Sequence, residues 1–558
     1  MNNTVDFKIK FTTTEESLET NEIQVIASLD NWNDFGYKIH CKCKLLNPLT
    51  NLPFYFDGFI GFLPPENKDG EFQKDYIDNL EADGMSMVAM MGYIEHLKSN
   101  NVIHILRFFT MLPSMGEYRK AVDELGPDIL GKVLEALNDL VYYKDKKSSW
   151  IEDAINSQVF KYGFMRNSEP FYAFSNAESI LGGVEDEVFD GISQNLTLKY
   201  KLEGFENTHE IKLNYDSASY IPKRINILIG KNGLGKSQAL KSFCRAALRY
   251  QDNTISLDAE ELNKRPMINR LLAIATPGET QNTFPAERRS TQKLYYRRLS
   301  LTRNGKAKTT KSIGELLVQL ARSKERIGRS TRWDLFIDAA SCILPIDRIV
   351  IELKSKKNVL LQALLNQNGE EACLTLWSEV DKNAEPKIKY SAELYSMSSG
   401  QLTFFKFALL CCLYIENGSF VLLDEPETHM HPNMISDFVE LLDYLLEETG
   451  SQALIATHSA YFVREVGREQ VHIFSSSKEI DSLPHHKSKI SIVSPRLRTF
   501  GADVESISQF VFNEDIENRL TDKIYKKLKD RTFESVEEEL GDELSLGALM
   551  NLKSKFEA

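Results

Sequence analysis

A glycine-rich segment from Gly230 to Ser237 carries the residue types that bind a phosphate chain. It reads Gly-Lys-Asn-Gly-Leu-Gly-Lys-Ser and fits the pattern G-x-x-x-x-G-K-[ST], or Walker A. In this pattern backbone N–H groups surround the phosphates, the lysine reaches the outer ones and the hydroxyl binds magnesium. The alternative, a glycine-rich surface loop, leaves the apolar segments on both sides unexplained. The pattern therefore predicts a nucleotide site that uses Asn232, Gly233, Gly235, Lys236 and Ser237.

Two later segments supply groups that would act on the bound phosphates. An apolar run beginning at Phe420 ends in Asp424 and Glu425. Because Mg²⁺ prefers oxygen ligands, we expect Asp424 to complete a magnesium site with Ser237. Glu425 would then accept a proton from the water that attacks the γ-phosphate, as in a Walker B motif. His458, in Thr-His-Ser, would hold that water or the γ-phosphate. A histidine taken alone is more often a core or capping residue, but its place after the other motifs favours a contact with the γ-phosphate.

Strands and a helix are predicted at the places where they would position these groups. Ile225–Ile229 and Ala453–Ala456 have the length and composition of buried strands, and Gln238–Tyr250 has helical spacing of apolar residues. A strand, a glycine turn and a helix N-terminus form an anion site. The sequence therefore predicts an α/β fold with the phosphate loop between a central strand and a helix.

A fourth motif, Met397-Ser398-Ser399-Gly400-Gln401, nearly matches L-S-G-G-Q, so the chain resembles the ATP-binding-cassette (ABC) ATPases. The resemblance implies an ABC-type head, with a mixed sheet around the phosphate loop and a helical subdomain. It also implies a homodimer, arranged head to tail, in which this signature closes over the ATP of the other copy. Ser398, Gly400 and Gln401 would make that contact. The simpler interpretation is an N-cap for a helix from Leu402 to Tyr414, and the two are compatible.

The residues after Glu425 distinguish branches of this superfamily. Pro426-Glu427-Thr428-His429-Met430-His431-Pro432 resembles the D-E-P-E-x-x-x-H-P segment of non-transport ATPases. Together with Leu271–Ala275, Asn282–Pro285 and Thr499–Asp503, it resembles the ATPase subunits of Septu-type anti-phage systems (PtuA-like), some of which are retron-associated. The resemblance covers about residues 196–520. The chain departs from the superfamily pattern at Ser399 and lacks a clear glutamine loop, for which Gln281 is the weak candidate.

This resemblance implies an ATPase that uses ATP and Mg²⁺ and that scaffolds and regulates a partner nuclease of the histidine-asparagine-histidine (HNH) type, in some systems with a retron reverse transcriptase and its DNA. We identify no nuclease motif in the chain. The acids between Val536 and Leu544 are interpreted as the solvated face of a helix, and His485-His486 lacks further ligands. A pair such as His429 and His431 is a weak metal signal without a third ligand.

The main alternative is a DNA-repair ATPase of the RecF type that binds DNA itself. It depends on the basic segment 288–332, where Tyr295 and Tyr296 could stack on bases. A solvated face or a surface for an acidic partner explains this segment equally well. Its basic residues are Arg288, Arg289, Lys293, Arg297, Arg298, Arg303, Lys306, Lys308, Lys311, Arg322, Lys324, Arg326, Arg329 and Arg332.

Composition places limits on these interpretations. The net charge is −13, which argues against a surface covered in nucleic acid, and 42% hydrophobic residues are enough for large cores. The longest apolar runs are too short to span a membrane, the N-terminus does not resemble a secretory signal, and the seven cysteines lack zinc spacing. We therefore expect a cytoplasmic protein. We expect an accessory α+β region at 1–150, an ATPase domain at 151–520 with an insertion at about 280–390, and a helical tail at 521–558.

Within the accessory region, Asp6–Phe11 and Tyr37–Cys43 alternate like strands, and helical patterning extends from about Tyr76 to Tyr143. Strands are also predicted at Leu196–Tyr200 and Glu210–Asn214, and we expect these to begin the sheet of the ATPase domain. Cys41 and Cys43 are expected to pack in a core.

Overall fold

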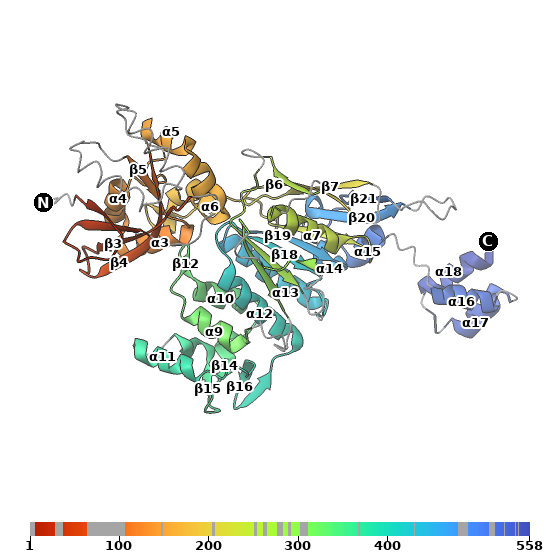
Figure 1. Ribbon diagram of the computed structural model, residues 1–558. Helices are drawn as coiled ribbons and strands as arrows, with labels where there is room; N and C mark the ends of the chain where they lie inside the picture. The colour runs from red at the N-terminus through yellow and green to blue at the C-terminus, as the bar shows by residue number, and fades with distance from the viewer. Residues whose placement is uncertain are drawn as a thin grey trace.

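A seven-stranded sheet lies at the centre of the predicted ATPase domain, which we call the head (Figure 1). The strand order is β11-β10-β18-β19-β8-β20-β21. All neighbours are parallel except β20 and β21, which are antiparallel. The strands are β8 (Ile225–Gly230), β10 (Arg270–Ala275), β11 (Tyr295–Ser300), β18 (Phe420–Asp424), β19 (Gln452–Thr457), β20 (Val471–Ser477) and β21 (Lys489–Val493). This computed structural model describes residues 6–27, 37–63, 107–144, 146, 149–202, 207–249, 254–260, 265–275, 283–287, 292–301, 311–365, 369–428, 430–477, 489–512, 519–528, 531–541, 543–544 and 546–557.

The central strands are buried on both faces, as expected for a parallel sheet between two layers. In β8, Ile225, Ile227 and Ile229 face one core and Leu228 faces the other. On the side of Leu228 lie helix α7 (Lys236–Ala247) and a separate antiparallel sheet. That sheet has the order β7-β6-β9, with β6 (Asn195–Lys201), β7 (Thr208–Asn214) and β9 (Ser256–Ala259).

The opposite face is covered by a helical layer that contains the predicted signature helix. Its helices are α9 (Ile313–Ala321), α10 (Arg332–Ser341), α12 (Ser399–Tyr414), α13 (Asn433–Glu448), α14 (Ala460–Val463) and α15 (Val504–Phe512). An antiparallel sheet, β15-β14-β16-β17, adjoins it. The strands of this sheet are β14 (Ile349–Glu352), β15 (Asn358–Leu360), β16 (Lys387–Tyr390) and β17 (Glu393–Ser396). The same part of the chain contains β12 (Arg326–Ile327), β13 (Ser330–Thr331), η6 (Ile346–Arg348), η7 (Leu361–Leu364) and α11 (Glu370–Glu379). A short turn, η8 (Arg468–Gln470), precedes β20.

A second α+β unit, which we call the accessory unit, contains the first five strands (Figure 1). The order is β1-β2-β3-β4-β5, with β1 parallel to β2 and the others antiparallel. Its core continues along the chain to Val184 and also includes Met267, from the segment before β10. Its elements are β1 (Lys8–Thr12), β2 (Glu22–Ala27), β3 (His40–Leu46), β4 (Pro53–Phe62), β5 (Phe108–Met111), α3 (Met115–Leu125), α4 (Pro127–Ala136), α5 (Ser149–Asn156), η1 (Val159–Gly163), η2 (Phe164–Arg166), α6 (Ser168–Asn176), η3 (Ala177–Ile180) and η4 (Val184–Asp186).

Most of the predicted elements are confirmed, with two corrections. The strands predicted at Leu196–Tyr200 and Glu210–Asn214 form, but they pair with each other and with β9 rather than entering the seven-stranded sheet. The stretch predicted as helical up to Tyr143 contains a strand, β5, at Phe108–Met111, before helices α3 and α4; residues 76–106 lie outside the described part. Alternation places Cys41 and Cys43 in the core, each 2% exposed.

Three helices follow the head: α16 (Arg519–Leu528), α17 (Phe533–Leu540) and α18 (Leu546–Glu557). In α17 the side chain of Val536 is buried, whereas Glu537, Glu538 and Glu539 are exposed, as expected for a solvated acidic face. Among the residues that the structure describes, no helix combines the length and apolar character needed to cross a membrane.

Candidate nucleotide-binding site

The phosphate loop lies between β8 and α7, at the carboxyl end of a central strand. Gly233 and Gly235 have φ angles of +80° and +92°, in the left-handed region that favours glycine. A Cβ atom on Gly235 would also lie 2.8 Å from Cδ1 of Leu202. Asn232 and Gly233 lie at the exposed tip, and α7 begins at Lys236. The loop thus presents the N-terminus of a helix to the space above the sheet, where an anion is stabilised.

Lys236 lies under this loop with its ammonium group tied to backbone oxygens. Its Nζ donates to the carbonyl of Gly230 at 2.8 Å and to that of Lys231 at 3.1 Å. It also lies 3.1 Å from Nδ1 of His458. Burial lowers the pKa of Lys236 to about 8, although the nearby carboxylates, Glu425 first among them, act in the opposite direction. A phosphate would supply the negative charge that favours the protonated lysine.

Ser237 and Asp424 meet across the loop and the end of β18. The Ser237 hydroxyl donates to Oδ1 of Asp424 at 2.9 Å. The Thr283 hydroxyl donates to Oδ2 of the same carboxylate at 2.8 Å. A hydroxyl and a carboxylate oxygen at this separation suit Mg²⁺, which takes one or two protein ligands and fills its octahedron with phosphate oxygens and water. The residues present therefore fit a magnesium ion held by Ser237 and Asp424.

Glu425 leaves the strand and meets His458 at the end of β19. Its φ of +48° ends the alternation of β18, and its backbone N–H still donates to the Ala456 carbonyl at 2.8 Å. Oε1 of Glu425 lies 2.5 Å from Nε2 of His458, and both side chains are 31% exposed. The carboxylate of Glu425 is therefore accessible to solvent, where it can accept a proton.

Two residues that contact the candidate site were not predicted from the sequence. Oε1 of Glu427 accepts hydrogen bonds from the Thr457 hydroxyl at 2.7 Å and from the His458 backbone N–H at 2.8 Å, so it fixes the start of the turn that carries the histidine. The position of Glu427 in Asp-Glu-Pro-Glu was the sequence signal that could have identified it. Thr283 was noted only as part of a resembling segment, and its contact with Asp424 spans 141 residues.

The signature residues are not joined to the phosphate loop within one chain. Ser398 caps α12: its Oγ accepts from the Gln401 N–H at 3.2 Å, and Oε1 of Gln401 accepts from the Ser398 N–H at 2.9 Å. Gly400 lies against Met434, where a Cβ would be 2.4 Å from the methyl carbon. The structure therefore brings Lys236, Ser237, Asp424, Glu425 and His458 together, and places Ser398, Gly400 and Gln401 on another element.

Three residues of the basic segment, Tyr296, Arg297 and Arg332, contact other parts of the protein. Tyr296 is 5% exposed and its hydroxyl donates to the Pro285 carbonyl, so it does not offer a ring for stacking. Arg332 is 1% exposed. Arg297 contacts Glu287 at 3.3 Å. The predictions for Arg288, Arg289, Arg303, Lys306, Lys308, Gln281, His429, His485 and His486 concern residues outside the described part.

A family model and a curated protein match parts of the chain. A family model described as "AAA domain, putative AbiEii toxin, Type IV TA system" matches residues 379–464, which contain the signature, Asp424, Glu425 and His458. Protein ea59 of Escherichia phage lambda is 23% identical over 473 residues, which are 78% of this chain and 81% of that protein.

Among solved structures, an SMC head domain from Thermotoga maritima is 14% identical with a TM-score of 0.26, covering 55% of this chain and all of that one. The cbiO1 protein of Clostridium perfringens, part of an ABC transporter complex, is 14% identical with a TM-score of 0.27, covering 61% of this chain and 97% of that one. The chain places the phosphate loop, β18 and α12 around one mixed sheet with a helical layer on one face, which is the α/β arrangement that the sequence predicts.

Proposed function

We propose that the chain binds ATP with Mg²⁺ and hydrolyses it, and that head-to-tail self-association completes each site. The observation that carries this proposal is the convergence of Lys236, Ser237, Asp424, Glu425 and His458 at the carboxyl ends of β8, β18 and β19. Lys236 and the first turn of α7 bind the phosphates. When bound, Mg²⁺ neutralises charge on the β- and γ-phosphates.

The remaining residues act on the water. Glu425 accepts the proton of the attacking water, and His458, held by Glu427, contacts Oε1 of this carboxylate and so orients both the carboxylate and the γ-phosphate. Lys236 contacts the ring of His458 as well as the loop carbonyls, so phosphate binding and the position of the histidine are linked.

The replacement Glu425→Gln tests this assignment. It keeps the shape of the side chain but removes the base, so we expect kcat to fall about 100-fold or more while ATP affinity is retained. Lys236→Ala should instead lose affinity, and Glu447→Gln, an exposed position on α13, should match the wild type. Turnover by phosphate release and affinity by a fluorescent ATP analogue give the two readouts. Wild-type turnover in Glu425→Gln would reject Glu425 as the base.

We further propose that this ATPase serves an anti-phage defence complex and regulates a partner nuclease of the HNH type. The supporting observations are the resemblance of the Asp-Glu-Pro-Glu region to Septu-type subunits and the description of the matching family as a putative toxin of a toxin–antitoxin system. Affinity purification from a host that carries the neighbouring genes, with and without ATP, tests it. A recovered nuclease, with or without a reverse transcriptase, is the expected result; recovery of chromosomal DNA and repair factors alone would instead favour a DNA-repair ATPase.

A further inference from the structure

A short turn connects the two halves of the ATPase machinery. Helix α12 starts at the signature and ends at Tyr414, and β18 starts at Phe420 and ends at Asp424. The five residues between them, 415–419, form what we call the junction turn. It contains Glu416, Asn417 and Gly418, which are typical of an exposed turn, but all five residues are buried. Polar groups in such a place require partners from elsewhere in the protein.

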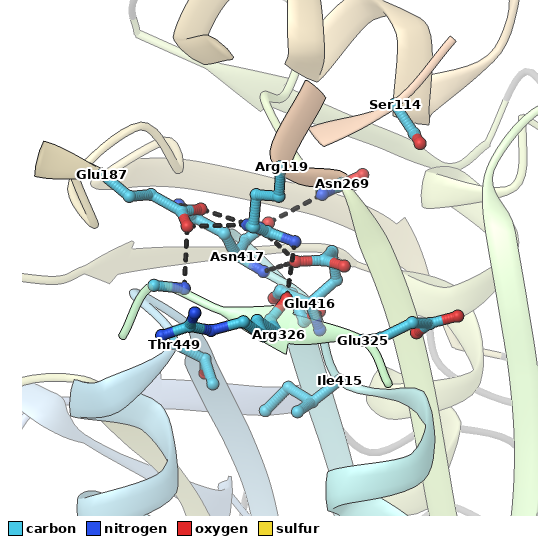
Figure 2. Close-up of polar contacts among 12 residues, drawn as sticks. Ser114, Arg119, Glu187, Asn269, Glu325, Arg326, Ile415, Glu416, Asn417 and Thr449 are labelled. Atoms are coloured by element: carbon cyan, nitrogen blue, oxygen red, sulfur yellow. Dashed lines mark hydrogen bonds and ion pairs between the residues drawn. The ribbon is translucent and has the colours of Figure 1, made fainter. Parts of the chain in front are cut away.

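The accessory unit supplies several of those partners (Figure 2). Arg119, on α3, donates through Nη2 to Oε1 of Glu416 at 2.6 Å. The same guanidinium donates to both carboxylate oxygens of Glu187, each at 2.7 Å. Glu187 in turn accepts a hydrogen bond from the Asn417 amide at 2.7 Å. Arg119 therefore closes a ring of charged and polar groups around the first residues of the junction turn.

A second accessory side chain holds the other half of the turn. The hydroxyl of Tyr172, on α6, donates to Oδ1 of Asn417 at 2.7 Å. Its ring lies against Gly418, which has a φ of +74°, and a Cβ there would lie 2.3 Å from the ring carbons. The junction turn can thus shift only if Tyr172 shifts with it, because the ring fills the space beside the backbone.

The helical layer contacts the other oxygen of the same carboxylate. Arg332, on α10, lies 3.3 Å from Oε2 of Glu416 and donates to the Ile415 carbonyl at 2.6 Å. Glu416 is 4% exposed, so this carboxylate interacts with two arginines from different units away from water. Separating one partner from such a cluster leaves a buried charge unpaired.

We infer that Arg119 and Tyr172 are positioning residues for ATP hydrolysis, through which the accessory unit and the nucleotide site control each other. This inference rests on the proposed function. With 16 residues, α12 is a rod about 24 Å long. When the ATP of a second copy binds the signature, it displaces the N-terminal end of α12, and the rigid helix moves the junction turn at its other end. The junction turn leads directly into β18, which precedes Glu425. It also contacts α3 and α6 of the accessory unit, through Glu416 and Asn417.

A pair of matched tyrosine variants tests the inference. Tyr172→Phe removes only the hydroxyl that holds Asn417. Tyr118→Phe removes an equally buried hydroxyl of the accessory unit, which donates to Asp139 at 2.9 Å and does not touch the junction turn. We expect similar small decreases in Tm for both variants. Only Tyr172→Phe should weaken ATP-dependent self-association, by about fivefold or more, the lower end of typical coupling between sites.

The readouts are ATP-dependent self-association by analytical ultracentrifugation, and kcat and KM by phosphate release. We expect KM to stay near the wild-type value in Tyr172→Phe while kcat falls, because the phosphate loop is untouched. Arg119→Lys should resemble wild type more closely than Arg119→Leu, since it retains a positive charge near Glu416. Equal self-association and kcat in Tyr172→Phe and Tyr118→Phe would overturn the inference and leave the ATPase proposal intact.

Measurements on the wild-type chain distinguish failure of the proposed ATPase function from failure of the inference about Arg119 and Tyr172. If the wild-type chain neither hydrolyses ATP nor self-associates with it, the proposed function fails and the inference fails with it. If it does either, hydrogen exchange adds a readout of the reverse direction, because coupling between binding equilibria is reciprocal. ATP should change the exchange of amides in α3 and α6 of the wild type, and less so in Tyr172→Phe. An ATP response of these helices that is identical in both proteins would contradict the inference.

Discussion

Replacing Glu416 with glutamine measures how strongly buried charge holds the junction turn. Burial of Glu416 opposes its ionisation, but the positive charges of Arg119, Arg270 and Arg332 outweigh this and lower its pKa from 4.5 to about 2. The difference between those values corresponds to about 3 kcal/mol. Removing one partner of a buried ion pair costs about 3–5 kcal/mol, so both approaches give the same magnitude.

The sign of the pH dependence follows from the lowered pKa. Because the folded pKa lies below the unfolded one, the stabilisation by Glu416 is complete above about pH 4.5 and is lost as the pH falls toward 2. At pH 7 the wild type therefore has the full contribution and Glu416→Gln lacks it. The difference in unfolding free energy between the two proteins should shrink as the pH is lowered through this range.

Urea denaturation at pH 7 followed by tryptophan fluorescence is a suitable assay, since Trp333 is 5% exposed and adjacent to Arg332. Glu352→Gln is a matched control. Glu352 contacts Lys356 and Lys387 at 2.9 Å each, and these lysines are 72% and 34% exposed. Exposed pairs contribute about 0–1 kcal/mol. Equal losses of unfolding free energy in the two variants would refute the argument that the Glu416 cluster acts as a buried network.

Two further predictions concern the nucleotide site. ATP affinity should fall as the pH rises above about 8, because burial lowers the pKa of Lys236 to about 8 and binding must then take up a proton. Calorimetry in buffers of different ionisation enthalpy would detect that proton, and an affinity independent of pH would contradict the prediction. Glu427→Ala should lower kcat roughly 10- to 100-fold by displacing His458. Combining it with His458→Ala should add little, and Glu427→Gln should retain activity because its oxygen still accepts both hydrogen bonds; additive losses in steady-state kinetics would argue against this role.

The nucleotide motifs could be predicted from the sequence because each is local. The pattern from Gly230 to Ser237 specifies its own backbone geometry, and apolar runs of strand length identified β8, β18 and β19. The order of these strands in the sheet then brings the ends of β18 and β19 beside the phosphate loop. The contacts among Ser237, Asp424 and His458 follow from that order, although no single segment contains them.

The contacts between distant segments could not be predicted in the same way. Arg119 and Glu416 are 297 residues apart, and periodicity says that a face is buried without saying what covers it. Counting basic residues in the segment 288–332 misjudged Arg332 because its partners are also distant in the sequence. In a count it adds to a basic segment, but its guanidinium is buried and bonded to the carbonyls of Cys412 and Ile415 as well as to carboxylates. The five N–H donors of a guanidinium can all find hydrogen-bond partners inside a protein, and the amino-acid composition does not show whether an arginine is buried in this way.

The junction turn shows which sequence signal would have revealed the accessory contact. Glu416, Asn417 and Gly418 have the composition of a solvent-exposed turn, yet they lie between an apolar helix and an apolar strand that are both buried. Such a turn either reaches water or obtains its hydrogen bonds from another unit. Here the second case holds, since Arg119 and Tyr172 come from the accessory unit. The head and the accessory unit therefore share a buried polar interface at the point where α12 meets β18, the strand that ends in Asp424, so a change in either unit acts on the other through that interface.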